Sequence, residues 1–400
     1  MQENNPSNDA SMPEQTPAWP PALPDSKPEW PPALPQTETT TLSLSKDQSP
    51  SNDTSDYVGK VHRFQFHGQA MEYFGIWIVN ILLTIVTLSF YAPWAKVRRL
   101  RYFYQNSELF QRRFDFTGVP TRILVGRLIA LGIWGGFALI AQFEPRVAAF
   151  GGIAIYIALP WLLRATLRFT SRNSKFGNSR FYFNGSTKNA YLQFILGLLI
   201  IIFTLGIFAP VMVWLYKRYY FNHLYVGQLN FKLKADWSSF MTAVYIPLIS
   251  FMIITVVYVL MVISSFGGMA VFDVSNLHII LGMIYYFIAI YLLGWIFLVP
   301  LIQARIFIIT WNSITLNNSV FKTDCNQWRY AWIVASNWIL KIFSLGLLSA
   351  WAAIRIYRYQ LESLSLYLND DPDQLMNMAQ EDPNAIAEEI SDIFDLDISL

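Results

Sequence analysis

The stretch Thr87-Leu88-Ser89-Phe90-Tyr91-Ala92-Pro93-Trp94 decides the architecture, because the chain repeats it twice. Residues 204–211 read TLGIFAPV, and residues 344–351 read SLGLLSAW. Gly and Pro at fixed offsets inside apolar sequence are typical of a turn or a break in a membrane helix. The chain therefore contains an internal repeat.

The repeat extends to both sides of this stretch. The segment FQFHG at 64–68 aligns with FYFNG at 181–185, and a third copy begins at Phe321. Basic and aromatic residues recur downstream at the same offsets: Arg98, Arg101 and Tyr102; Arg218 and Tyr219; Arg355, Arg358 and Tyr359. The segment 160–181 also matches 300–321, so the predicted order alternates one repeat helix with two further helices.

The composition indicates a membrane protein, since 54% of the 400 residues are hydrophobic and only 14% are charged. A helix needs about 20 mostly apolar residues to cross a bilayer. Seven segments approach that length: 73–95, 123–141, 147–163, 191–215, 243–264, 279–303 and 330–352. We therefore expect an all-α polytopic membrane protein with about seven transmembrane helices.

Short polar stretches between the helices have strand character. Apolar residues alternate over 167–183 around Lys-Phe-Gly-Asn, and over 307–321 around Leu-Asn-Asn-Ser. The segments 102–116 and 219–233 are weaker versions of the same pattern. We expect small β-hairpins at the membrane surface.

Two tails flank the membrane domain, which we place at 58–365 with repeats beginning near 64, 181 and 321. Residues 1–57 are rich in Pro and repeat Trp-Pro-Pro-Ala-Leu-Pro at 19–24 and 30–35, which predicts an extended or disordered tail. Such a tail suits a tether or a pair of short motifs for a protein partner. Residues 366–400 are rich in Asp and Glu, which predicts an acidic tail. The start of the chain shows no basic segment followed by an apolar core, so we expect no cleavable signal peptide.

The first repeat resembles the bacterial DUF898 family. The resemblance lies in Phe66-His67-Gly68, Glu72-Tyr73-Phe74, 80–84 and 87–94, followed by Arg98 to Tyr102. It covers roughly 58–365 and is weakest in the third copy, where Cys325 and Ala350 replace Gly and Pro. The resemblance implies a bacterial inner-membrane location, but this family assigns no catalytic or binding residues.

The distribution of Lys and Arg leaves two topologies open. Basic loops stay cytoplasmic, and both helix pairs have basic flanks with poorly charged turns near Arg146 and Asp273. In the first topology all seven segments span, as an inverted-topology repeat. In the second, each repeat helix breaks at its turn and returns to the side it entered. We favour the first.

Candidate binding residues are the repeated cations and one cation at membrane depth. Arg98, Arg101, Arg218, Arg355 and Arg358 suit either interfacial anchoring or an anionic ligand such as a lipid headgroup. Lys341 lies inside the seventh segment, where a buried charge is a functional candidate.

No catalytic or cofactor motif is present. The four histidines lack metal-ligand spacing, the single cysteine excludes a disulfide framework, and a net charge of +2 does not suggest a nucleic-acid partner. We therefore expect a non-enzyme without metal or cofactor, surrounded by membrane lipids. Two functions stay open: transport of a small solute or ion, and a membrane scaffold or assembly role.

Overall fold

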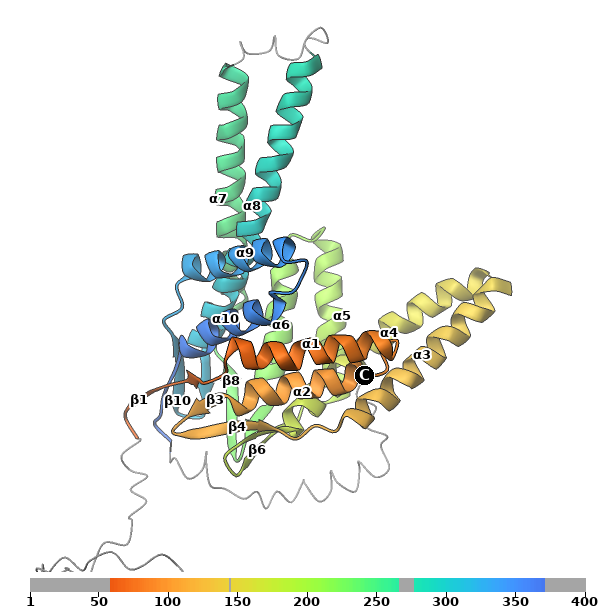
Figure 1. Cartoon of the computed structure of the whole chain (residues 1–400), viewed down its shortest axis with the longest axis vertical. Coiled ribbons are helices and arrows are strands. Elements are labelled where there is room, and N and C mark those ends of the chain that lie inside the picture. The colour runs from red at the N-terminus through yellow and green to blue at the C-terminus, as the bar shows by residue number, and fades with distance from the viewer. Residues whose placement is uncertain (1–57, 144, 266–276, 371–400) are drawn as a thin grey trace, which may run out of the picture. The chain divides into compact units, whose positions relative to one another are not determined.

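The computed structural model describes residues 58–370, except residue 144 and residues 266–276 (Figure 1). Within these residues, ten helices pair into five helical hairpins, and a strand lies before and after each hairpin. The outgoing strand leads into the helices, and the returning strand follows them. The fold is therefore five strand–helix–helix–strand units in succession.

The units have the following bounds. The first contains β2 (Gln65–Phe66), α1 (Ala70–Val86), α2 (Ala92–Gln105) and β3 (Ser107–Leu109). The second contains β4 (Arg112–Phe116), α3 (Pro120–Phe143), α4 (Pro145–Arg172) and β5 (Ser174–Phe176). The third contains β6 (Ser179–Phe183), α5 (Thr187–Phe203), α6 (Ala209–Asn222) and β7 (Leu224–Val226). The fourth contains β8 (Leu229–Leu233), α7 (Trp237–Ser265), α8 (Leu277–Asn312) and β9 (Ile314–Leu316). The fifth contains β10 (Ser319–Thr323), α9 (Gln327–Phe343), α10 (Ser349–Glu362) and β11 (Leu364–Tyr367).

One antiparallel sheet joins all five units. Its order is β1-β11-β10-β9-β8-β7-β6-β5-β4-β3-β2, where β1 is Val61–Arg63. The two ends of this order, β1 and β2, are separated in the chain by Phe64 alone. The sheet therefore curls until its ends meet in one short segment, which makes a nearly closed barrel.

The barrel has two different ends. Successive units are joined by tight turns such as Phe110-Gln111, where both residues have positive φ, of 53° and 59°, as a type I′ hairpin turn requires. Within a unit the strands are joined instead by a helical hairpin. Since neighbouring strands are antiparallel, the tight turns lie at one end and all five helical hairpins leave from the other.

The same hydrogen bond closes every unit where helices meet strands. The donor is the N–H of the first residue after the outgoing strand. The acceptor is the carbonyl of the first residue after the second helix. The five donor–acceptor pairs are His67–Asn106 (2.9 Å), Thr117–Asn173 (2.8 Å), Asn184–His223 (2.9 Å), Lys234–Ser313 (2.8 Å) and Asp324–Ser363 (3.0 Å). The units thus share a backbone geometry although their helices differ in length.

The stretch that the sequence repeats at 87–94, 204–211 and 344–351 contains the turn between the two helices of the three short hairpins, α1/α2, α5/α6 and α9/α10. Leu205 and Gly206 have φ of 49° and 85°, and the Gly206 N–H bonds the Ile201 carbonyl at 2.8 Å. This six-to-one bond ends α5 as a Schellman motif. The Thr204 hydroxyl then accepts the N–H of Phe208, the residue before α6, at 3.2 Å. Residues 87–91 and 344–348 form the same turn in the other two copies.

The expectation of an all-α protein with about seven transmembrane helices is wrong. Each of the segments 73–95, 191–215 and 330–352 is two short helices, because the left-handed turn residues reverse the chain. Only four described helices are long and apolar enough to cross a membrane: Pro120–Gln142, Gly151–Arg172, Trp237–Ser264 and Ile284–Asn312. Figure 1 shows α7 and α8 side by side as one such pair.

The prediction of an inverted-topology repeat is also wrong, because it requires the segments 73–95, 191–215 and 330–352 to cross the membrane as single helices. The four expected hairpins are present, as β3–β4, β5–β6, β7–β8 and β9–β10. They are not separate surface elements, because their strands belong to the one barrel sheet. The tails 1–57 and 371–400 lie outside the described residues.

A chamber inside the barrel

Five phenylalanines occupy the same place in the five outgoing segments. They are Phe64, Phe114, Phe181, Phe231 and Phe321. Side chains alternate between the two faces of a strand, and the shared register places all five rings in the barrel interior, where they line one cavity. A ring of aromatic side chains therefore encircles the lumen.

The phenylalanines contact one another around most of this ring. Ring centroids lie 6.2 Å apart for Phe64 and Phe114, 6.4 Å for Phe64 and Phe321, 6.0 Å for Phe231 and Phe321, and 6.4 Å for Phe181 and Phe231. Phe176 of β5 packs 4.6 Å from Phe114 in the remaining sector. Offset aromatic pairs at such separations are stabilising by about 0.5–1.5 kcal/mol beyond burial.

The lumen is not filled by these side chains. A cavity of about 390 Å³ remains, bounded by the phenylalanine ring, by residues of the returning strands such as Leu109, Val226 and Leu366, and by the bases of the helices. Barrels of about eight strands are filled by their own side chains, whereas wider ones enclose ligand cavities. This cavity falls within the usual size range of small-molecule sites.

Hydroxyl groups gather where the helices meet the barrel. Ser107 donates to the Phe103 carbonyl at 2.7 Å, and its Oγ lies 3.0 Å from the Tyr357 hydroxyl. Ser174 repeats this arrangement one unit on, since it donates to the Thr170 carbonyl at 2.7 Å and lies 3.2 Å from the Tyr104 hydroxyl. Each serine thus holds a tyrosine at the cavity wall.

A further pair of hydroxyls comes from α4 and α6. Ser171 is 3% exposed, lines the cavity, and its Oγ makes no hydrogen bond of regular geometry. Its neighbour across the units is Tyr220: burial raises the pKa of Tyr220, and the nearby Ser171 hydroxyl offsets part of the rise. Both hydroxyls are therefore uncharged polar groups at the wall of the cavity.

The cavity is electrically neutral. Burial raises the pKa of Tyr104, and it raises the pKa of Tyr357 to about 12, against a smaller opposing effect of the Ser107 hydrogen bond. These phenols therefore stay protonated at physiological pH. None of the lining residues, all within the described part of the chain, is Asp, Glu, Lys, Arg or His. In the same part, no cluster of three His, Cys, Asp or Glu could hold a metal.

The cations singled out from the sequence lie outside this chamber. Arg101 donates to the Phe116 carbonyl at 3.3 Å, and Arg358 donates to the Gly68 carbonyl at 2.7 Å. Each arginine thus joins a helix of one unit to the backbone at the end of the outgoing strand of the neighbouring unit. An anionic-ligand role for them stays a prediction.

The remaining candidates are dispersed. Arg98 bonds the Tyr91 hydroxyl at 3.0 Å, Arg218 lies over the Trp214 ring at 4.9 Å, and Arg355 donates to Ser336 at 2.7 Å. Lys341 lies in the last turn of α9, near the tip of the fifth hairpin. None of them lines the chamber.

One sequence element marks the segments that line the chamber. The element Phe-x-Phe-x-Gly at 64–68 and 181–185 also occurs at 114–118, ahead of the first helix pair. It shows that the helix pairs belong to the same kind of unit as the repeats. The inward direction of the rings follows only from the closed sheet.

Comparison with known proteins identifies the family. A bacterial protein family of unknown function, DUF898, matches residues 61–393, which is most of the chain. The chain belongs to the DUF898 family. The match includes all five units, whereas the tail 1–57 lies outside it.

Relatives of this DUF898 protein include inner membrane proteins named YjgN. The chain is 31% identical over 128 residues to YjgN of Escherichia coli (strain K12), covering 32% of each chain. It is 29% identical over 131 residues to YjgN of Escherichia coli O157:H7 and 30% identical over 132 residues to that of Salmonella typhimurium, covering 32% of this chain and 33% of each relative. The matched stretch thus spans about a third of these relatives. No solved structure matches. The chain is a protein of the bacterial inner membrane.

Proposed function

We propose that this DUF898 protein binds a small, uncharged, mainly apolar molecule, or the apolar chain of an amphiphile, inside its barrel and exchanges it with the bilayer. The observation that carries the proposal is the neutral chamber of about 390 Å³ ringed by five phenylalanines. An apolar guest would gain roughly 25 cal/mol for each Å² of apolar surface it buries there.

The hydroxyl groups at the helix end define which guests fit. Ser171 and Tyr220 offer uncharged hydrogen-bonding groups on one side of an otherwise apolar wall. A hydroxyl or carbonyl at one end of a hydrocarbon suits this arrangement. A free ion does not, because the chamber offers no charge to replace its hydration.

This proposal narrows the transport hypothesis to an apolar solute and keeps a non-catalytic role. The lining residues include no carboxylate, imidazole, thiol or amine for acid–base or nucleophilic chemistry. The scaffold hypothesis depends on the Trp-Pro-Pro motifs, which lie outside the described residues, and it stays a prediction.

Photo-crosslinking tests the proposal. A fatty alcohol of about ten carbons that carries a diazirine is added to the protein in lipid nanodiscs, and the labelled peptides are identified by mass spectrometry. We expect label on the lumen-facing residues of β5 and β7, in addition to lipid-exposed helices. Label confined to the helices would contradict the proposal.

A matched pair of variants makes this test specific. Val226→Trp fills the lumen, because Val226 is buried and lines the cavity. Tyr225→Trp changes the adjacent residue of β7, which stacks on Tyr182 at 4.8 Å on the other face of the strand. We expect Val226→Trp to lower barrel labelling at least fivefold and Tyr225→Trp to leave it unchanged. Thermal melting of both variants separates loss of binding from loss of folding.

A further inference from the structure

The three short helical hairpins end in turns whose large apolar side chains contact almost nothing. Leu88 is 85% exposed, Leu205 is 92% exposed and Leu345 is 94% exposed. Phe203 and Phe343 beside them are nearly as exposed. Apolar side chains gathered so completely at a tip indicate a partner that is itself apolar.

The topology fixes where these tips lie relative to the candidate spans. All five helical hairpins leave from the same end of the barrel, and the pairs α3/α4 and α7/α8 contain the four helices able to cross a membrane. The short hairpins alternate with these pairs along the chain, and the first and fifth hairpins, both short, are neighbours where the barrel closes. The end of the barrel that faces the bilayer is therefore the end that presents the three tips.

We propose that α1/α2, α5/α6 and α9/α10 enter one leaflet of the membrane and return without crossing it. The pairs α3/α4 and α7/α8 cross and return. The barrel then lies on the cytoplasmic side. The partner of the tips is the acyl region of the lipids.

Helix length separates the two kinds of hairpin. The first helices of the short hairpins, α1, α5 and α9, have 17 residues each, or about 25 Å at 1.5 Å per residue. This is shorter than a hydrocarbon core of about 30 Å. By contrast, α7 has 29 residues and α8 has 36, or about 44 Å and 54 Å.

The turns satisfy the main condition for backbone at membrane depth, which is that polar groups bond internally. Gly206 N–H bonds the Ile201 carbonyl, and Ile207 N–H bonds the Thr204 carbonyl at 3.0 Å. The Thr204 hydroxyl donates to the Ile200 carbonyl at 2.6 Å and accepts the Phe208 N–H. Such a turn can enter lipid without leaving these groups unpaired.

Charge placement predicts a different depth for each tip. No charged residue lies between Lys188 and Lys217, so α5/α6 can enter deepest. In α1/α2 the first charge beyond the turn is Lys96. In α9/α10, Lys341 lies three residues before the turn, and its ammonium must reach the headgroups, which keeps this tip shallow.

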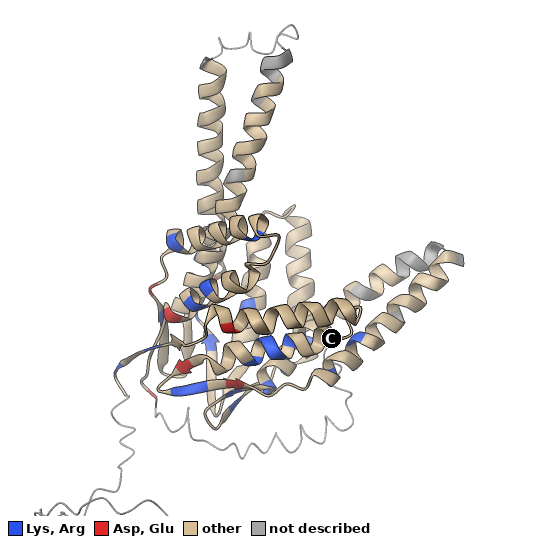
Figure 2. Ribbon diagram, viewed as in Figure 1, with Lys and Arg blue, Asp and Glu red and all other residues tan. Residues whose placement is uncertain are grey.

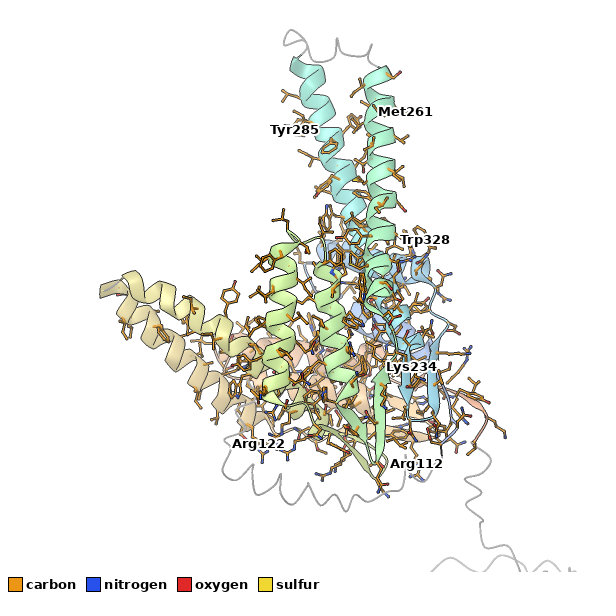
Figure 3. The ribbon with its side chains drawn as sticks, turned by 180° about the vertical axis from the view of Figure 1, so that it is seen from behind. Arg112, Arg122, Lys234, Met261, Tyr285 and Trp328 are labelled. Carbon is orange, nitrogen blue, oxygen red and sulfur yellow. The ribbon has the colours of Figure 1, made fainter. Side chains whose placement is uncertain are left out.

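The first and last described residues of the barrel, near Gly59 and Leu368, lie at its tight-turn end. β1 and β11 pair at Val61 and Tyr367, and the Gly59 N–H bonds the Leu368 carbonyl at 2.8 Å. Figure 2 shows most Lys and Arg on the strands and on the helices close to them, while α7 has no charged residue and the charge of α8 is Arg305, near its barrel end. Figure 3 shows the same division, with Arg112 and Lys234 at the barrel and Met261 and Tyr285 far along α7/α8. Cations remain cytoplasmic, which orients the barrel.

Cysteine labelling tests the proposal. Cys325 is the single native cysteine and is replaced by Ala, the residue at the equivalent position 235. New cysteines are then introduced at Leu205, Ser264 and Gln228, and a membrane-impermeant maleimide is applied to whole spheroplasts and to inverted vesicles. We expect Ser264→Cys to react in spheroplasts, Gln228→Cys to react in inverted vesicles, and Leu205→Cys to react in neither.

Labelling of Leu205→Cys from the outside would show that α5/α6 spans and would overturn the proposal. Labelling from the inside, as strong as that of Gln228→Cys, would place the tip in water and overturn it too. Labelling in detergent with urea confirms that each cysteine can react.

Spin labels measure depth independently of these reagents. Nitroxides on cysteines at Leu88, Leu205 and Leu345 in proteoliposomes report the ratio of oxygen to nickel-complex accessibility. We expect the depth order Leu205, then Leu88, then Leu345, with a control at Arg112 fully accessible to nickel. A nickel accessibility at Leu205 equal to that at Arg112 would contradict insertion.

Discussion

Ser89 occupies a position at which the other two copies of the turn have glycine. Its φ is 73°, whereas Gly206 and Gly346 have φ of 85° and 89°. A side chain in the left-handed region is disfavoured by about 1–2 kcal/mol, and glycine avoids this.

We predict that Ser89→Gly raises the unfolding free energy by about 1 kcal/mol, since it removes that strain. Thermal unfolding in detergent measures the change. The reverse substitution, Gly206→Ser, serves as the matched control and should lower stability by a similar amount. A lower melting temperature for Ser89→Gly would contradict the explanation.

The buried phenol of Tyr357 should make the stability of the protein depend on pH. Its pKa of about 12 lies above the usual 10.0, because burial disfavours the phenolate. The folded state thus favours the neutral phenol, and the resulting stability is complete below pH 10 and lost as the pH rises toward 12.

We expect the melting temperature of the wild type to fall more steeply between pH 10 and 12 than that of Tyr357→Phe, which has no phenol to ionise. The same substitution at Tyr367, which lies on β11 outside the candidate membrane spans and is partly exposed, serves as a control. Equal slopes for the wild type and Tyr357→Phe would show that this phenol does not contribute.

At the scale of elements, Asp370 joins the end of the domain to the β9–β10 turn. Its buried carboxylate accepts the Asn318 and Ser319 N–H groups at 3.1 Å and 2.9 Å, the Ser319 hydroxyl at 2.6 Å and the Asn317 amide at 2.9 Å. Charge-assisted bonds of this kind are strong.

We predict that Asp370→Ala destabilises the protein by about 1–3 kcal/mol and speeds amide exchange in β10 and β11. Glu362→Ala is the control, because Glu362 is half-exposed and lies 3.9 Å from Arg358. Its effect should be below about 0.5 kcal/mol. Unchanged exchange in Asp370→Ala would mean that the turn is held by other contacts.

At the scale of the whole molecule, closure depends on residues 61–66. β1 pairs with β11, and β2 pairs with β3, so one short segment satisfies both edges of the sheet. Without it, two unpaired strand edges would be exposed, and such edges promote aggregation.

We predict that a chain lacking residues 1–57 remains monodisperse in detergent with its melting temperature unchanged, whereas a chain lacking residues 1–66 aggregates. Size-exclusion chromatography and melting curves compare the two. A well-behaved chain without residues 1–66 would show that closure is not needed for the fold.

The sequence by itself determined the membrane location, the family, the repeat and the places of the hairpins. Each of these is a local property: apolar composition, Gly and Pro at fixed offsets, or alternation over a few residues. The same local evidence left the repeat helices open between spanning and turning back. It favoured spanning because hydropathy counts apolar residues and is insensitive to a left-handed turn at Leu205 and Gly206.

Only the tertiary structure decided the barrel and its chamber. Strands of two to five residues have weak local signals, and the pairing of Val61 with Tyr367 joins residues that are far apart in the chain. The five phenylalanines are present in the sequence, but the direction that their side chains share depends on the register of the whole sheet. Closure is a long-range property, since each strand edge is satisfied only when the last strand meets the first.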